Sequence, residues 1–300
     1  MSNTDNNKKV IILTGGSDGI GRNALNYLVK EDNTKIILPV RNLEKGEKVI
    51  EELKQINPNA DLKLMKMDLS SQESIKSFVN EFNSLNEPLD ILVNNAGILT
   101  NEFRKNSDGY ELTMGTNHLG TSLLTLLLLP NLNKSKLEGG GNIVIVSSKM
   151  HSYIGSLDFD KELGNETESD YSSTNSYSKS KLYNLLFAQE LQKKLDQSES
   201  SIKVNALHPG FTMTSLAHEY NWFARGFTAL LTYLIGDNLD DMGRGLAELA
   251  LNKSNIKGKY LNITQITQTS KFAQDPSNSL KLWEKTCQML GFDSNNLKLN

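Results

Sequence analysis

The residue spacing that best suggests chemistry in this chain is that of Tyr177 and Lys181, which lie four positions apart. On a helix, this spacing places both side chains on the same face. A phenol has an ordinary pKa of roughly 10, so it exchanges protons poorly at neutral pH unless a nearby ammonium group favours the phenolate. The pair could therefore serve as a general acid and base. Tyr171 and Tyr183 have no lysine four residues later, although many helices carry such a pair without a catalytic role.

A glycine-rich segment at residues 14–21, TGGSDGIG, could hold a phosphate group. Gly15, Gly19 and Gly21 lack the Cβ atoms that would block a tight turn, a pyrophosphate against the backbone, and close packing of a helix on a strand. The segment follows an expected strand and begins an expected helix, whose first N–H groups and positive dipole end attract anions. This context favours a dinucleotide site over an ordinary loop.

The residue that would select the dinucleotide is Arg41, twenty positions after Gly21. An acidic residue at about this place suits the ribose of NAD, whereas an arginine suits the extra phosphate of NADP. No Asp or Glu ends the second expected strand, and a guanidinium group matches phosphate geometry and stays charged. We therefore predict NADP(H) in preference to NAD(H). The alternative is a solvated surface arginine.

Short apolar segments alternate with helical periodicity, which is typical of βαβ units and a parallel sheet. Strands are expected at residues 10–14, 35–40, 62–67, 89–94, 142–147, 202–207 and 258–263. Helices are expected at residues 22–31, 44–56 and 72–85, the last with Ser71 as its N-cap. Several strands are almost purely apolar, as in sheets covered on both faces. We predict one α/β domain with a doubly wound parallel sheet of about seven strands and helices on both faces.

Three further segments follow the glycine-rich segment: residues 94–97 (NNAG), 146–148 (VSS) and 177–181 (YSKSK). Together the four segments resemble the short-chain dehydrogenase/reductase family, and the resemblance extends from Val10 to about Gly291. Within that family, the chain is similar to retinol dehydrogenases and to the oxidoreductase part of WW-domain-containing oxidoreductase. The resemblance implies a Rossmann fold over residues 10–291, after a disordered polar segment at residues 1–9 and before a C-terminal tail at residues 292–300.

The resemblance also implies a catalytic set made of Asn117, Ser148, Tyr177 and Lys181. Tyr177 would protonate a carbonyl oxygen as hydride arrives, or deprotonate an alcohol in reverse, while Ser148 donates a hydrogen bond to the same oxygen. Lys181 would hold the nicotinamide ribose, and Asn117 would support a water relay to this lysine. Two alternatives stay open, because Ser147 competes with Ser148 and Asn117 could instead bond backbone atoms within a helix.

The same resemblance implies cofactor contacts in each motif. They are Gly15, Ser17, Asp18, Gly19, Ile20, Gly21, Arg41, Asp68, Leu69, Asn94, Ala96, Gly97, Tyr177, Lys181, Pro209, Gly210, Thr212 and Thr214. Asp68 and Leu69 would touch the adenine, although Asp68 could instead simply start the next helix. Residues 94–97 would line the ribose and support the sheet, and the loop after Pro209 would hold the nicotinamide amide and the phosphates.

Composition and charge exclude several other classes of protein. With 32 Lys and Arg against 35 Asp and Glu, the net charge is −3, whereas nucleic-acid binding needs a cationic surface. Cys287 is the only cysteine, so the chain is not a disulfide scaffold, and the histidines do not form a metal-ligand spacing. The polar first nine residues do not resemble a signal peptide. We expect a cytoplasmic protein without a metal, or one that lies peripherally on an intracellular membrane.

An apolar segment at residues 222–235 is expected beside the substrate, within a lid at about residues 212–240. The segment could be a mobile lid, a buried helix or a peripheral membrane contact, and the apolar residues 123–129 could contribute to a homodimer. These features favour a hydrophobic carbonyl or alcohol as substrate, such as a retinoid, a steroid or a lipid aldehyde. The alternative function is a non-catalytic dinucleotide-binding sensor or scaffold.

Overall fold

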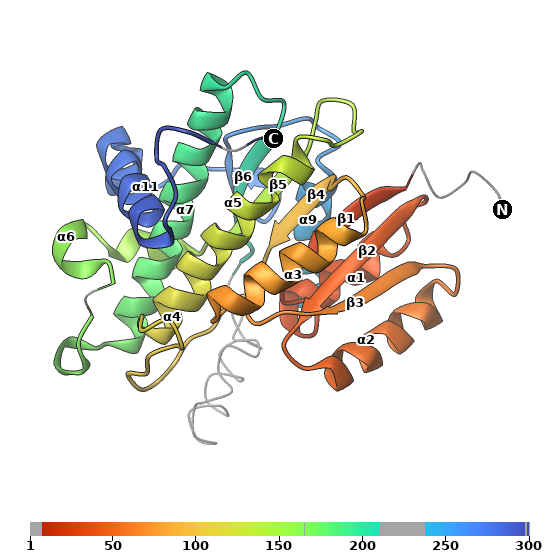
Figure 1. The fold of residues 1–300 in the computed structure, drawn as a ribbon, viewed down its shortest axis with the longest axis horizontal. Coiled ribbons are helices and arrows are strands. Elements are labelled where there is room, and N and C mark those ends of the chain that lie inside the picture. The colour runs from red at the N-terminus through yellow and green to blue at the C-terminus, as the bar shows by residue number, and fades with distance from the viewer. Residues whose placement is uncertain (1–7, 165, 211–237, 298, 300) are drawn as a thin grey trace.

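The computed structural model describes residues 8–164, 166–210, 238–297 and 299, which Figure 1 shows in colour. In this part of the chain, one sheet has the strand order β3-β2-β1-β4-β5-β6-β7-β8. The strands are β1 Lys9–Leu13, β2 Thr34–Val40, β3 Asp61–Lys66, β4 Ile91–Asn94, β5 Asn142–Val146, β6 Lys203–His208, β7 Tyr260–Asn262 and β8 Gln265–Ile266. All neighbours are parallel except β7 and β8. The predicted parallel sheet of about seven strands is confirmed, and the short antiparallel β8 is added at its edge.

Helices cover both faces of this sheet (Figure 1). One face carries α1 Gly19–Leu28, α2 Leu43–Ile56 and α9 Leu239–Leu251, and the other carries α3 Gln72–Ser84, α5 Thr121–Leu132 and α7 Ser173–Gln197, with α11 Pro276–Leu290 packed on α7. The shorter helical segments are α4 Leu112–Met114, η2 Gly115–Gly120, η3 Lys149–Tyr153, α6 Phe159–Glu162, η4 Glu168–Asp170 and α10 Lys271–Gln274. Val10 and Ile12 enter one apolar core while Ile11 and Leu13 enter the other. Two buried faces therefore explain why several of the strands are almost purely apolar.

The first three helices begin at side chains that cap them. Ser71 Oγ accepts a hydrogen bond from Ser74 N at 3.2 Å, which confirms the predicted N-cap of α3. Asp18 and Asn42 cap α1 and α2 in the same way. Each cap satisfies an N–H group that the first helical turn leaves without an intrahelical acceptor. The turns between strands and helices are therefore short and well defined.

The direction of strand order reverses between β1 and β4, which are neighbours in the sheet. In doubly wound folds, the crevice at such a point, outside the carboxyl ends of the strands, binds the ligand. The glycine-rich segment follows β1, and the other predicted segments follow the same ends of their strands: Arg41 after β2, Asp68 after β3, Asn95 after β4, Ser148 after β5 and Pro209 after β6. The topology therefore brings residues that are far apart in sequence to one edge of the sheet.

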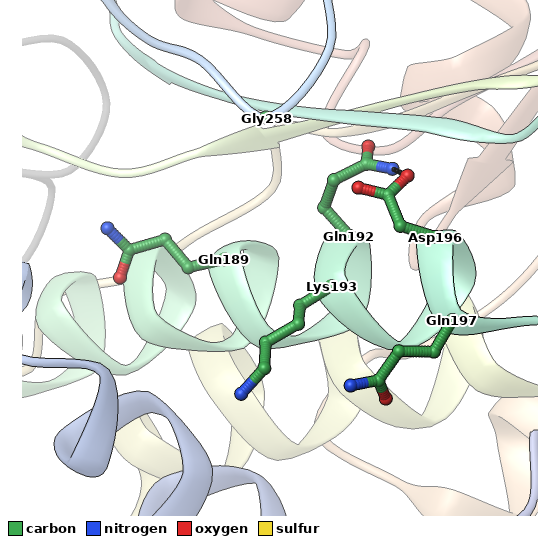
Figure 2. A pocket seen from close by; sticks show the side chains of 6 residues that line it. All are labelled: Gln189, Gln192, Lys193, Asp196, Gln197 and Gly258. Atoms are coloured by element: carbon green, nitrogen blue, oxygen red, sulfur yellow. Dashed lines mark hydrogen bonds between the residues drawn. The ribbon is translucent and has the colours of Figure 1, made fainter.

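The C-terminal half of α7 is tied to the sheet, which fixes the helix that carries Tyr177 and Lys181. Gln192 Oε1 accepts a hydrogen bond from Val204 N in β6 at 2.6 Å, and Gln192 Nε2 donates to Asp196 at 2.9 Å. Figure 2 shows these two α7 side chains beside a hollow at the surface. The hollow is lined by Gln189, Gln192, Lys193, Asp196, Gln197 and Gly258. The bond between Gln192 and Val204 anchors α7 beyond the predicted catalytic residues.

Trp283 in α11 and the residues after this helix contribute to the core beside α7. Trp283 stacks on Phe187 with ring centroids 5.5 Å apart, and its Nε1 donates a hydrogen bond to the Ser294 carbonyl at 2.9 Å. Phe292 and Leu297, from the predicted C-terminal tail, pack against the same cluster. These contacts hold α11 against α7.

A buried carboxyl group beside α7 makes the stability of the fold depend on pH. Burial, with a smaller contribution from the nearby Glu111 carboxylate, raises the pKa of Glu166 to about 7. Because the unfolded pKa is about 4.5, the contribution of this group to stability is full below that pH and is lost as the pH rises through 7. We expect the free energy of unfolding to fall by about 1–3 kcal/mol between about pH 4.5 and 8, measured by urea unfolding.

The variant Glu166→Gln isolates this effect, because an amide has no proton to lose over that range. We expect its free energy of unfolding to decrease less with pH than that of the wild type. Glu168→Gln serves as the control, since Glu168 is exposed and should leave the pH dependence unchanged. The same pH dependence in wild type and Glu166→Gln would show that this carboxyl group is not responsible.

Candidate active site

The glycine-rich segment forms a tight turn between β1 and α1. Gly15 and Gly19 have φ of +69° and +56°, in the left-handed region that favours glycine. A Cβ atom on Gly15 would lie 2.8 Å from Ala96 Cα, and one on Gly21 would lie 2.4 Å from the Gly15 carbonyl oxygen. Ser17 lies within the same turn. The turn therefore requires glycine at positions 15 and 21 for close packing, and at positions 15 and 19 for backbone conformation.

The N-terminus of α1 offers hydrogen-bond donors at this turn. Asp18 Oδ1 accepts from Gly19 N at 2.7 Å, and Asp18 Oδ2 pairs with Lys45 Nζ at 2.9 Å. The N–H groups of Ile20 and Gly21 belong to the first helical turn and have no acceptor within the helix. Such donors, together with the positive end of the helix dipole, suit a pyrophosphate group. The residues present thus fit the phosphates of a dinucleotide.

Thr14 and Asn95 hold the glycine turn against the end of β4. Thr14 Oγ1 accepts hydrogen bonds from Asn95 N and Ala96 N, each at 3.0 Å. Asn95 Nδ2 donates to the Thr14 carbonyl at 3.0 Å and to the Gly15 carbonyl at 3.3 Å. Asn95 is absent from the predicted contacts, although it lies within the NNAG motif. Its side chain, together with the backbone N–H of Ala96, joins that motif to the glycine turn.

Asn94 precedes Asn95 and is a predicted cofactor contact, but its side chain bonds a residue of α5. Its side-chain Nδ2 donates a hydrogen bond to Thr125 Oγ1 in α5 at 2.8 Å, and the side chain is buried. Adjacent residues in a strand point to opposite faces, so Asn94 and Asn95 have different neighbours. Asn94 therefore supports the sheet, as the sequence also predicts for this segment.

Two cationic residues, Arg41 and Lys45, follow β2. Arg41 follows β2 directly and its side chain is exposed, while its carbonyl oxygen accepts a hydrogen bond from Lys66 Nζ at 2.7 Å. Lys45, in the first turn of α2, reaches back to Asp18. A contact between Arg41 and a 2′-phosphate stays a prediction.

Asp68 and Leu69 follow β3 at the same edge. Asp68 Oδ1 accepts hydrogen bonds from Ser70 N at 2.9 Å and from Ser70 Oγ at 2.7 Å. This geometry favours the alternative in which Asp68 shapes the turn before α3. The Leu69 carbonyl lies against Gly120, where an added Cβ atom would come within 2.1 Å of its oxygen. An adenine contact by either residue stays a prediction.

Tyr177 and Lys181 occupy one face of α7, at the carboxyl end of β5. Lys181 Nζ lies 5.4 Å from the centroid of the Tyr177 ring and donates a hydrogen bond to the Val146 carbonyl at 3.2 Å. Tyr177 is 8% exposed and Lys181 3% exposed. The predicted pair is therefore brought together in a nearly dry environment.

The two serines after β5 have different partners. Ser147 Oγ donates to the Lys181 carbonyl at 2.7 Å, so this hydroxyl is occupied by the backbone of α7. Ser148 Oγ accepts from Met150 N at 3.2 Å and hydrogen-bonds with the Tyr177 side chain. The geometry thus favours Ser148 over Ser147 as the partner of Tyr177.

In the protein without a bound cofactor, burial opposes the effect that the sequence predicts for the lysine on the pKa of Tyr177. The lysine is expected to lower the pKa of Tyr177, whereas burial raises it, and the hydrogen bond from Ser148 only partly offsets that change. Lys181 Nζ lies over the Tyr177 ring and donates a hydrogen bond to the Val146 carbonyl. Burial also lowers the pKa of Lys181 to about 8. Tyr177 is therefore protonated at neutral pH in this structure.

Asn117 lies in η2, a single π-helical turn before α5. Its Oδ1 accepts from Ile98 N at 2.7 Å, and its Nδ2 donates to the Ile98 carbonyl at 2.9 Å and to Ser180 Oγ at 3.0 Å. Gly97 lies between it and Lys181, since an added Cβ atom there would be 3.2 Å from Lys181 Nζ and 3.4 Å from Asn117 Oδ1. Asn117 thus bonds the backbone of another segment while lying beside the lysine. Its water relay stays a prediction.

Part of the predicted site lies outside the described residues. Pro209 and Gly210 follow β6, and Gly210 has φ of +105°. Thr212, Thr214 and the apolar segment at residues 222–235 lie beyond them, at positions that the structure does not describe. Among the helices in residues 8–164, 166–210 and 238–297, none is long and apolar enough to cross a membrane.

Comparison with known proteins identifies the family. A profile of short chain dehydrogenases matches residues 9–156. The chain is 33% identical to "Short-chain dehydrogenase TIC 32 B, chloroplastic" of Brassica napus, over 93% of this chain and 88% of that protein. It is 31% identical to retinol dehydrogenase 11 of Homo sapiens, over 94% and 86% of the two chains. It is 32% identical to polyprenol dehydrogenase of Homo sapiens, over 94% and 85%.

Solved structures share the fold. An uncharacterised protein from Mycobacterium paratuberculosis superposes with a TM-score of 0.74 at 26% identity, covering 95% of this chain and 94% of that one. Actinorhodin polyketide ketoreductase superposes with a TM-score of 0.64 at 21% identity, covering 87% and 97%. The motifs, the fold and the relatives agree, and this chain belongs to the short-chain dehydrogenase/reductase family of oxidoreductases.

Proposed function

We propose that this protein is an NADP(H)-dependent oxidoreductase that interconverts hydrophobic carbonyls and alcohols, with Tyr177 as the general acid and base. One observation carries the proposal: Ser148, Tyr177 and Lys181 meet at the edge of the sheet that also carries the glycine turn. A hydroxyl donor, a phenol and an ammonium beside a dinucleotide site are the groups that carbonyl reduction needs.

The donors of the glycine turn would hold the pyrophosphate, and Lys181 would hold the nicotinamide ribose. Arg41 would bind the 2′-phosphate of NADP, because a guanidinium forms strong charge-assisted hydrogen bonds with phosphate. The nearby Lys45 pairs with Asp18, which leaves Arg41 as the exposed cation directly after β2. The bound nicotinamide would supply or accept the hydride.

In the direction of reduction, Tyr177 and Ser148 have different roles at the carbonyl oxygen of the substrate. The raised pKa of Tyr177 keeps its hydroxyl protonated, so it can give a proton to the carbonyl oxygen. Ser148 donates a hydrogen bond to the same oxygen and stabilises the charge that develops there. In the reverse direction, a charged Lys181 is needed to favour the phenolate that accepts the alcohol proton.

The substrate class rests on the apolar character of residues 222–235 and on the relatives. Retinol dehydrogenase 11 and polyprenol dehydrogenase are named for apolar alcohols. The test is NADPH consumption by the purified protein with aliphatic, retinoid and steroid aldehydes and ketones. We expect turnover with the apolar aldehydes. Tight NADPH binding without turnover of any carbonyl would instead favour a dinucleotide-binding sensor or scaffold.

Arg41→Asp tests the choice of dinucleotide. Removal of one charge-assisted phosphate contact and introduction of a like charge should raise the KM for NADPH by about tenfold to a hundredfold, and leave the KM for NADH little changed. Steady-state kinetics with both cofactors measures this. Lys54→Asp makes a similar charge change at the other end of α2 and should not alter the preference. A parallel change in both KM values of Arg41→Asp would contradict the assignment.

A further inference from the structure

His151 makes a set of contacts that the proposed reaction does not use. It lies in η3, three residues after Ser148, and is 3% exposed. Its Nδ1 is 2.7 Å from the Ser148 carbonyl oxygen, and its Nε2 is 3.1 Å from Ser270 N at the start of α10. The ring meets the edge of Tyr260 in β7 at 5.2 Å between centroids, and Nδ1 is 3.4 Å from the Tyr260 hydroxyl.

These partners determine which ring nitrogen carries the proton. The Ser270 backbone N–H can only donate, so His151 Nε2 must accept. The Ser148 carbonyl can only accept, so Nδ1 must carry the proton and donate to it. This neutral tautomer agrees with burial, which lowers the pKa of His151. Both nitrogens are engaged, which leaves neither free to exchange a proton with a substrate.

The same residue bonds Ser148 twice. The Ser148 carbonyl accepts from the backbone N of His151 at 3.1 Å as well as from the ring. The ring is fixed in turn by Ser270 and Tyr260, which come from the C-terminal part of the chain. The backbone of Ser148 is therefore held between β7, α10 and its own turn, and its hydroxyl faces Tyr177.

We propose that His151 is a positioning residue, which holds the Ser148 backbone through the Nδ1–H···O bond and so aims the Ser148 hydroxyl at the reacting oxygen. The proposal rests on the proposed function, because the orientation of the Ser148 hydroxyl affects turnover only if Ser148 acts on a substrate. Small displacements of positioning groups reduce turnover strongly, since the transition state requires close alignment. The expected consequence is a loss in kcat with cofactor binding intact.

The experiment compares three substitutions that remove different parts of the ring. The Asn side chain places an N–H donor near the position of Nδ1, Gln places an acceptor near that of Nε2, and Leu offers neither. We expect His151→Gln and His151→Leu to lower kcat by about tenfold, and His151→Asn to retain most of it. The KM for NADPH should not change. Tyr260→Phe, which keeps the ring but loses the 3.4 Å hydroxyl contact, is the matched control.

Unchanged kcat in His151→Gln and His151→Leu would overturn the proposal, as would an equal loss in all three variants. A similar loss in Tyr260→Phe would assign the effect to that hydroxyl instead. If the wild-type protein turns over no carbonyl, the proposed function fails. The tautomer of His151 then tests the hydrogen bond from its ring to Ser148 independently of activity. In a ¹⁵N-histidine NMR spectrum we expect His151 to have a protonated Nδ1 and an unprotonated Nε2, whereas a protonated Nε2 would overturn the proposal.

Discussion

Tyr177→Phe should lower kcat for carbonyl reduction by about 10³-fold and leave the dissociation constant of NADPH unchanged. The substitution removes only the hydroxyl that would donate the proton, and the ring keeps its packing beside Lys181. Ser148 and the glycine turn remain, so residual turnover would come from hydride transfer without the acid. Steady-state NADPH consumption measures kcat, and the fluorescence of NADPH measures its binding.

Tyr183→Phe is the matched control for this prediction. Tyr183 lies on the same helix, is fully buried, and its hydroxyl has no hydrogen-bond partner among the described residues. Its removal therefore costs no hydrogen bond that the structure describes, and kcat should be unchanged. An equal loss in both variants would indicate disturbance of α7 in general. Full activity of Tyr177→Phe would show that another group supplies the proton.

The fold could be predicted because its strands and helices have strong patterns. Several of the seven parallel strands are almost purely apolar, helical periodicity separates the strands, and Ser71 marks the start of α3. β8 has only two residues, both exposed, so neither periodicity nor hydrophobicity distinguishes it from a loop. Pairing with β7, rather than its own sequence, makes it a strand.

A residue's place in the candidate site can be predicted from the sequence where it follows from the residue's own type. Glycine at positions 15 and 21 is such a case, because the added Cβ atoms have no room. The role of Asn95 depends instead on the direction in which its side chain points at the end of β4. The sequence of the motif alone does not distinguish Asn95 from Asn94 in this respect.

The pKa of Tyr177 could not be predicted for a related reason. The sequence spacing gives the proximity of Lys181 but neither the burial of the phenol nor the bond that draws the ammonium toward the Val146 carbonyl. Desolvation opposes the charged form of both groups. The balance between burial and charge is therefore a property of the folded site.

Gly21→Ala should raise the dissociation constant of NADPH by about a hundredfold. The new Cβ atom would lie 2.4 Å from both the Gly15 carbonyl oxygen and Asn95 Nδ2, so the turn must open. Opening it separates Asn95 from Thr14 and moves the N–H donors of α1 away from the pyrophosphate. NADPH fluorescence titration measures the loss, and we expect the free energy of unfolding to fall by about 1–3 kcal/mol as well.

Gly16→Ala separates the effect of the turn from that of any added methyl group. A Cβ atom at Gly16 would meet the side-chain ends of Leu25 and Leu38, at 2.9 Å and 3.0 Å, and these can move. We therefore expect some loss of stability from Gly16→Ala but little loss of NADPH binding. If both variants lost binding equally, packing beneath the turn would matter more than its shape. Loss in Gly21→Ala alone would mean that the bond from Asn95 to the turn determines whether the cofactor binds.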